Sequence, residues 1–146
     1  MKAEPLRALL DVNVILDVIA RREPHYPASA SAWTMVETGR AIGLVAAHGI
    51  TTLHYLIARQ IGRAAAAAVI ADVLSVFTVA TVDGAVLNTA LALGWTDFED
   101  AVHAAAASAA GADYLVTRNV ADFKDGLIPV VTPDAFSALV VTVDAS

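Results

Sequence analysis

Side chains that can bind a metal ion or transfer a proton follow several of the apolar segments of this chain. Asp11 comes directly after one such segment, and Thr117 and Asn119 close another. Asp97 and Asp100 lie where an alanine-rich helix is expected to begin. Parallel sheets carry their ligands outside the carboxyl ends of the strands. We therefore expect these residues, distant in sequence, to converge at one edge of a sheet.

Carboxylates that converge at neutral pH favour a hard divalent cation. Because they repel one another, each would take up a proton unless a cation lay between them. Mg²⁺ and Mn²⁺ prefer oxygen ligands and keep several waters. Such an ion lowers the pKa of a bound water and can stabilise negative charge that develops on a phosphate. The pattern therefore favours hydrolysis of a phosphate ester.

A purely structural interpretation of the same residues stays open. Asp11 can be a turn or cap residue, and Asn119 can be a turn residue. Asp97 and Glu99 favour a helix dipole when they lie in the first helical turn. Asp100 lies beyond the expected capping box, one turn before His103, so the helix alone explains it less well.

Alternating apolar and helical segments predict a three-layer α/β/α fold with a mostly parallel sheet of about five strands. The expected strands are 6–10, 41–46, 76–80, 114–117 and 128–131. The expected helices are 14–20 after an Asn13 cap, 28–38, 51–60, 63–74, 84–93 after an Asp83 cap, one from the Thr96–Glu99 capping box to about 110, and a short one from Pro133. No linker or repeat divides the chain, so residues 1–146 are expected to form a single domain.

Composition excludes several classes of protein. The absence of cysteine excludes a disulfide framework and a thiolate metal site, and the net charge of -6 excludes a polycation that holds nucleic acid by bulk charge. The uncharged stretch 41–58 reads as a strand, a turn and a helix start rather than a membrane span. We expect a cytoplasmic protein. Because 58% of its residues are hydrophobic, we also expect a partner to cover part of its surface.

Three segments, 11–17, 97–105 and 114–123, together resemble the motifs of the PIN-domain nucleases, a family that includes the toxins of VapBC toxin–antitoxin pairs. The resemblance implies a PIN-like domain with divalent-metal-dependent ribonuclease activity, a homodimer and an antitoxin partner. Asp11 matches the first acid of the family, Asn13 its accompanying polar residue, and Asp100 the acid of the later helix. Two further family acids are replaced here, by Thr52 and Asn119.

The resemblance also implies roles for these side chains. Asp11, Asp100 and Asn119 are the expected catalytic residues, and Mg²⁺ or Mn²⁺ is expected to bind Asp11, Asp100 and Asp97. Supporting roles fall to Asn13, Thr117, Thr52 and Asp122. Because neutral side chains replace two carboxylates, a weakened metal site is expected.

RNA must also be held by positive charge. Arg118 lies next to the expected metal site, and Arg118 and Arg59 are the expected RNA contacts. Arg21 and Arg22 follow the first helix and are expected to lie farther away, while Lys124 is a further candidate. His54 and His103 are weaker candidates for proton transfer, since buried structural roles explain both.

Two other functions fit parts of the pattern. A degenerate PIN domain would keep the fold and bind nucleic acid or a protein partner without catalysis, and the replacements at Thr52 and Asn119 favour it. A phosphatase of the haloacid-dehalogenase type would also place Asp11 after the first strand. That chemistry needs a second acid two residues on, where this chain has Asn13, so we expect no turnover of simple phosphate esters.

Overall fold

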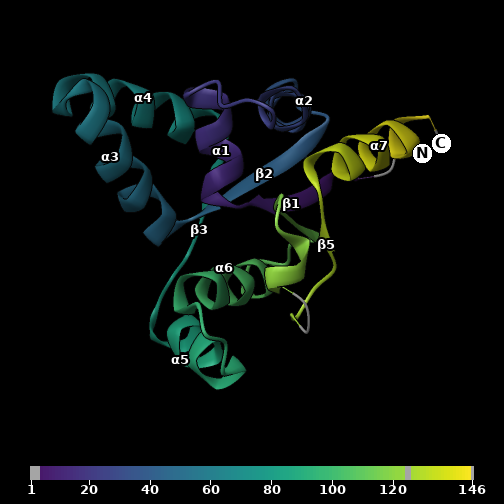
Figure 1. Cartoon of the computed structure of the whole chain (residues 1–146). Helices are drawn as coiled ribbons and strands as arrows, with labels where there is room; N and C mark the ends of the chain where they lie inside the picture. Colours follow the sequence, from purple (N-terminus) through teal and green to yellow (C-terminus); the bar gives the residue numbers. More distant parts are fainter. Residues whose placement is uncertain (1–3, 124–125, 146) are drawn as a thin grey trace.

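A five-stranded parallel sheet forms the middle layer of the protein. The computed structural model describes residues 4–123 and 126–145. The sheet has the strand order β3-β2-β1-β4-β5, and every neighbouring pair is parallel (Figure 1). Its strands are β1 (Leu6–Leu10), β2 (Ala41–Ala46), β3 (Thr78–Ala80), β4 (Tyr114–Val116) and β5 (Val130–Val131). β1 therefore lies at the centre, with β2 and β4 on either side.

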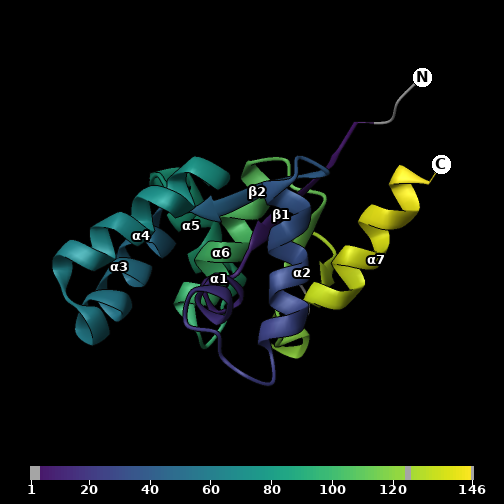
Figure 2. The same ribbon diagram turned by 90° about the horizontal axis from the view of Figure 1, so that it is seen from above.

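Helices cover both faces of this sheet, as Figures 1 and 2 show. One layer contains α1 (Val12–Ile19), α2 (Tyr26–Glu37), α3 (Ala47–Ile61), α4 (Arg63–Val76) and α7 (Pro133–Asp144). The other contains α5 (Gly84–Leu93) and α6 (Phe98–Ala109), followed beyond β4 by the short 3₁₀ helix η1 (Val120–Phe123). This arrangement confirms the three-layer α/β/α fold expected from the sequence.

The central strand contributes to both hydrophobic cores. Leu10 packs with Ile15 and Phe136 on one side of the sheet, and Leu9 packs with Leu115 and Phe123 on the other. Successive side chains of a strand point to opposite faces, so a strand covered on both faces is apolar throughout. Burial on both faces explains why the last residues of β1 are all apolar. Asp11 is the first polar side chain beyond them.

Several helix boundaries differ from those expected. The N-cap of α1 is Asp11 rather than Asn13, and the N-cap of α6 is Asp97 rather than Thr96. A carboxylate that accepts a backbone N–H is an effective cap, and it replaces the predicted partner in both cases. α4 continues to Val76, which shortens β3 to three residues, and α7 is a full helix of 12 residues.

α3 begins at Ala47 instead of residue 51, so Gly49 lies inside a helix rather than in a turn. A Cβ atom at Gly49 would lie 2.9 Å from Val12 Cγ2. Gly49 is therefore needed for the close approach of α3 to the start of α1. Within residues 4–123 and 126–145, no helix combines the length and the apolar character that crossing a membrane requires.

Gly43 of β2 provides a test of the packing. A Cβ atom there would lie 2.6 Å from Val36 Cγ1 and 2.7 Å from Phe77 Cδ1. We expect Gly43→Ala to lower the free energy of unfolding by about 1–3 kcal/mol, because a packed core cannot absorb an added methyl group without strain. Urea denaturation measures the change. Gly84→Ala is the control, since no atom lies within 4 Å of its new Cβ, and equal stability of the two variants would contradict the packing.

Candidate functional site

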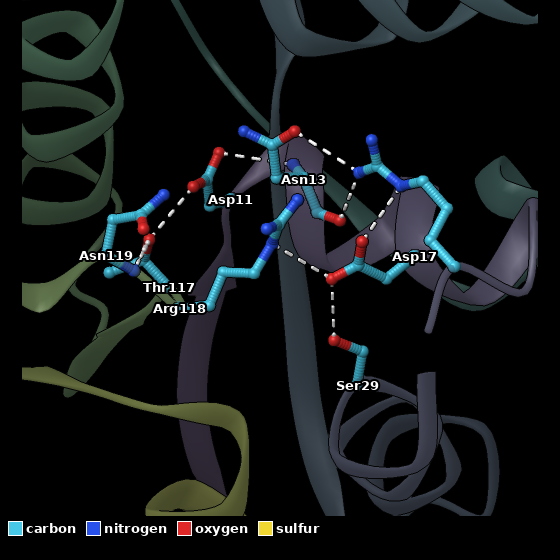
Figure 3. Close-up of polar contacts among 8 residues, drawn as sticks. Asp11, Asn13, Asp17, Ser29, Thr117, Arg118 and Asn119 are labelled. Atoms are coloured by element: carbon cyan, nitrogen blue, oxygen red, sulfur yellow. Dashed lines mark hydrogen bonds and ion pairs between the residues drawn. The ribbon is translucent and has the colours of Figure 1, made fainter. Parts of the chain in front are cut away.

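Asp11 lies between the end of β1 and the start of α1 and is 6% exposed. Its Oδ1 accepts a hydrogen bond from the backbone N–H of Asn13 at 3.3 Å, which caps the helix. Its Oδ2 accepts one from Thr117 Oγ1 at 3.0 Å (Figure 3). Both carboxylate oxygens are therefore held in fixed directions.

The parallel pairing of β1 with β4 places Thr117 beside Asp11. Leu10 and Val116 are register partners, so the next residue of each strand lies at the same edge of the sheet. Thr117 is fully buried, and its Oγ1 also accepts the backbone N–H of Asn119 at 3.1 Å. One threonine hydroxyl thus connects the loop after β4 to the acid after β1. The structure brings these three residues together, as the sequence predicted.

Asp100 lies in the first turn of α6, where Asp97 Oδ1 accepts its backbone N–H at 3.1 Å. Burial first, and then the negative charges of Asp97, Asp11, Asp122 and Glu99 in that order, together raise the pKa of Asp100 from 3.8 to about 7. The charge of Asp11 therefore acts on Asp100 across the site. Four predicted acids from three separate segments share one electrostatic neighbourhood.

The side chains of Asp11, Asp97, Asp100 and Asp122 offer oxygen ligands, which Mg²⁺ and Mn²⁺ prefer. A cleft of about 410 Å³ opens beside it, lined among others by Trp95, Asp97, Asp100 and Asp122. No set of three or more His, Cys, Asp or Glu side chains within residues 4–123 and 126–145 is arranged to hold a metal ion. Mg²⁺ needs only one or two carboxylates when waters fill its remaining positions. The pair Asp11 and Asp100 fits such a water-rich ion.

Other predicted residues lie on α3. Thr52 is partly buried, and its hydroxyl donates to the His48 carbonyl of the same helix at 3.3 Å. Arg59 is exposed, with its Cζ 5.5 Å from the centroid of the Tyr55 ring. His54 is partly buried, as expected. The candidate Lys124 lies outside the described residues.

A second group of polar residues lies beside Asp11, and its central residue, Asp17, was not predicted from the sequence. Asp17 of α1 has a fully buried side chain and forms ion pairs with Arg22 Nε at 2.9 Å and Arg118 Nε at 3.1 Å (Figure 3). Ser29 Oγ donates to Asp17 Oδ2 at 3.2 Å. Asn13 and Asp17 are four residues apart on one helix, and this spacing was the available signal that they share a face.

Arg22 lies close to the site, contrary to the expectation that it would be distant. Arg21 adopts a left-handed conformation with φ 50°, and the Arg22 N–H donates to the Asp17 carbonyl at 3.0 Å. The chain therefore turns back along α1. One terminal nitrogen of Arg22 then donates to the Asn13 carbonyl and to Asn13 Oδ1 at 3.2 and 3.3 Å.

Two histidines pack edge to face near the acids, with the ring centroids of His48 and His103 4.4 Å apart. His103 is 1% exposed, and its Nδ1 lies 3.0 Å from the Glu99 carbonyl oxygen. Burial, and then the charge of His103, lower the pKa of His48 to about 4. At neutral pH His48 therefore contributes no positive charge to the acidic cluster.

The raised pKa of Asp100 predicts a pH-dependent stability. Because folding raises this pKa from 3.8 to about 7, the folded state binds the proton more tightly than the unfolded state. The contribution of Asp100 to the free energy of unfolding is therefore present below pH 3.8 and is lost as pH rises to about 7. In EDTA we expect Asp100→Asn to be more stable than the wild type at pH 8, with the difference shrinking towards pH 4.

Urea denaturation across this pH range measures the effect. Asp72→Asn, at an exposed position of α4, is the control and should leave the pH profile unchanged. Parallel profiles of stability against pH for the wild type and Asp100→Asn would contradict the raised pKa of Asp100.

The chain is similar to known proteins both in sequence and in fold. Residues 7–121 match the family model of the PIN domain. The fold is similar to that of VapBC2 from Rickettsia felis bound to a DNA fragment from its promoter, with 15% identity, a TM-score of 0.68, and coverage of 87% of this chain and 98% of that one.

It is also similar to DNA-bound VapBC from Salmonella typhimurium, with 17% identity, a TM-score of 0.66 and coverage of 88% and 98%. PAE2754 from Pyrobaculum aerophilum has 20% identity, a TM-score of 0.61 and coverage of 94% and 90%. No curated protein matches the sequence. Because the family model spans most of the chain, from within β1 to beyond β4, this protein belongs to the PIN-domain family.

Proposed function

We propose that this protein is a divalent-metal-dependent endoribonuclease that hydrolyses RNA phosphodiester bonds, and that it is the toxin of a toxin–antitoxin pair. The main support is the geometry at the sheet edge, where the pairing of β1 with β4 places Asp11 beside Thr117 and where Asp100, at the start of α6, lies within reach of the Asp11 charge. Membership of the PIN-domain family supports the same chemistry.

Each side chain has a defined task in this proposal. Asp11 and Asp100 hold the ion, and Asp97, Asp122 and Asn119 supply further oxygens to it or to its waters. Thr117 fixes the Asp11 carboxylate through its 3.0 Å hydrogen bond. Mg²⁺ or Mn²⁺, when bound, supplies an activated water and neutralises charge that develops on the phosphate.

The site is expected to be weaker than one with four carboxylates. Thr52 stands at a position where the family resemblance implies an acid, and its hydroxyl is engaged by its own helix. Asn119 stands at another such position. Fewer carboxylates attract a divalent ion less strongly, so activity should require a higher concentration of metal.

The alternative is a PIN domain that binds nucleic acid or a partner without cleaving RNA. The neutral residues Thr52 and Asn119 favour it, as does the absence, among the residues that the structure describes, of a group of three metal-ligating side chains. The two functions differ in one observable result. Only the nuclease cleaves RNA, and it requires a divalent metal ion to do so.

We also infer an antitoxin partner and a cytoplasmic homodimer. Two of the similar structures are of VapBC complexes. Large apolar side chains are exposed on α3 and α4, which pack against each other, among them Tyr55, Ile61 and Leu74. Exposed apolar side chains gathered on neighbouring elements are typical of protein interfaces, which supports coverage of these two helices by a partner chain.

Substitution of the two central acids tests the proposed nuclease. We expect Asp11→Asn and Asp100→Asn each to lower the rate of Mn²⁺-dependent RNA cleavage by more than about 100-fold, because loss of an outer-shell partner alone costs about 10–100-fold. Cleavage of a labelled RNA is followed by gel electrophoresis across a series of Mg²⁺ and Mn²⁺ concentrations.

Asp72→Asn is the matched control, since it removes one exposed acid from α4 and should retain full activity. Equal cleavage by the wild type and both acid variants in EDTA would indicate a contaminant and would refute the enzyme. Metal-independent RNA binding without any cleavage would establish the alternative function.

A further inference from the structure

The buried cluster of ion pairs around Asp17 carries an excess positive charge. The proposed metal site gives no reason for this charge. One carboxylate, fully buried, faces two guanidinium groups. Burying a carboxylate is costly unless charged and hydrogen-bonding partners compensate it. A single arginine together with Ser29 would balance the charge of Asp17. The second arginine leaves one positive charge in excess beside the cleavage site of a protein whose net charge is -6.

The geometry of the ion pairs leaves the outer parts of both guanidinium groups available. Asp17 engages each arginine through Nε, the nitrogen nearest the chain. Arg22 uses one terminal nitrogen for Asn13. Its other terminal nitrogen and both of Arg118 make no hydrogen bond within residues 4–123 and 126–145. The side chains of Arg22 and Arg118 are 36% and 23% exposed, so solvent and ligands reach them.

The position of the cluster relates it to the acids. Arg118 directly follows Thr117, whose hydroxyl donates to Asp11. Arg22 donates to Asn13, and the backbone N–H of Asn13 in turn donates to Asp11. Figure 3 shows the Arg118 side chain extending from beside Asp11 towards Asp17. Acids gather on the α6 side of the site, whereas this flank of Asp11 carries two guanidinium groups. An anion bridging the two would therefore contact the arginines on one side and face the metal ligands on the other.

We propose that Asp17 is a positioning residue that holds Arg22 and Arg118 as a paired clamp for an RNA phosphate next to the scissile one. Guanidinium groups bind phosphate oxygens in a bidentate geometry. Because Asp17 already holds each arginine through Nε, less rotamer entropy is lost when the phosphate binds. This inference rests on the proposed ribonuclease function for the identity of the ligand. It adds Arg22 to the RNA contacts expected from the sequence, and it makes Asp17 the residue that positions both arginines.

The test measures RNA binding without cleavage. The full-length protein is titrated into a fluorescein-labelled single-stranded RNA in EDTA, and anisotropy is recorded over a series of NaCl concentrations. We expect Arg22→Gln and Arg118→Gln each to weaken binding about 10-fold or more, because each removes a charged hydrogen-bond donor. Each should also reduce the slope of log affinity against log salt by about 0.7, the value for one phosphate contact on a single strand.

Arg40→Gln is the matched control. Arg40 also pairs with a carboxylate through Nε, at 2.6 Å from Asp144 Oδ2, and is similarly exposed, but lies on the connection between α2 and β2. It should bind RNA with the affinity and salt slope of the wild type. Equal affinity of Arg22→Gln, Arg118→Gln and Arg40→Gln would overturn the clamp.

The positioning role of Asp17 needs its own variants. Asp17→Asn should weaken RNA binding as the arginine variants do, since the guanidinium groups lose their anchor. Because removing a buried charge can prevent folding, Ser29→Ala provides a milder change, which removes one hydrogen bond to Asp17. It should weaken binding in the same direction by a smaller factor. Wild-type RNA affinity in both folded Asp17→Asn and Ser29→Ala would show a merely structural role for Asp17 and would overturn its positioning role.

The outcome is separable from that of the nuclease test. Loss of RNA binding in the arginine variants supports the clamp even if metal never produces cleavage. Unchanged binding refutes it even if cleavage requires Asp11. A polyglutamate peptide is titrated in parallel, and peptide binding at these arginines in place of RNA would reassign them to an acidic protein segment and overturn the proposal.

Discussion

The pairing of β1 with β4 is the constraint on which the site depends. The register of Leu10 with Val116 places Asp11 and Thr117 at one edge of the sheet, where a hydrogen bond of 3.0 Å joins them. Neighbouring segments are held by this pair. The backbone N–H of Asn119 donates to the Thr117 hydroxyl, and Asp11 caps the start of α1. A slip of one residue would move Asp11 to the opposite face of the strand. Burial of β1 on both faces makes such a slip costly, so the hydrophobic cores also fix the position of the chemistry.

Charge is distributed unevenly around this pair. On the side of α6, burial and then the neighbouring acids raise the pKa of Asp100 to about 7. On the side of α1, Asp17 gathers two arginines. The crowding of the acids opposes folding near neutral pH in the absence of a cation, a cost typical of functional sites. A metal ion would relieve the repulsion on one side, and a phosphate would neutralise the excess charge on the other. The two halves together suit a metal-bound phosphodiester.

The sequence predicted the sheet and the main acids because both depend on local patterns. Apolar segments marked the strands, and the rule that ligands gather at strand ends placed Asp11, Thr117 and Asn119 together. Arg22 was misplaced because its position depends on the left-handed conformation of Arg21, which no sequence rule for arginine indicates. Asp17 was overlooked for a related reason, since its partners come from a turn and from the loop after β4. The start of α3 was predicted too late because Gly49 reads as a turn residue unless the closeness of α1 is known.

In the proposed nuclease, Asp11 and Asp100 hold one divalent cation between them. Crystals of the protein grown with Mn²⁺, with diffraction recorded near the manganese absorption edge, test it most directly. We expect a single anomalous peak, from an ion coordinated by a carboxylate oxygen of each residue and by waters, and we expect this peak to be absent from crystals of Asp11→Asn. Full Mn²⁺ occupancy elsewhere, or the two carboxylates directed to different surfaces, would contradict it.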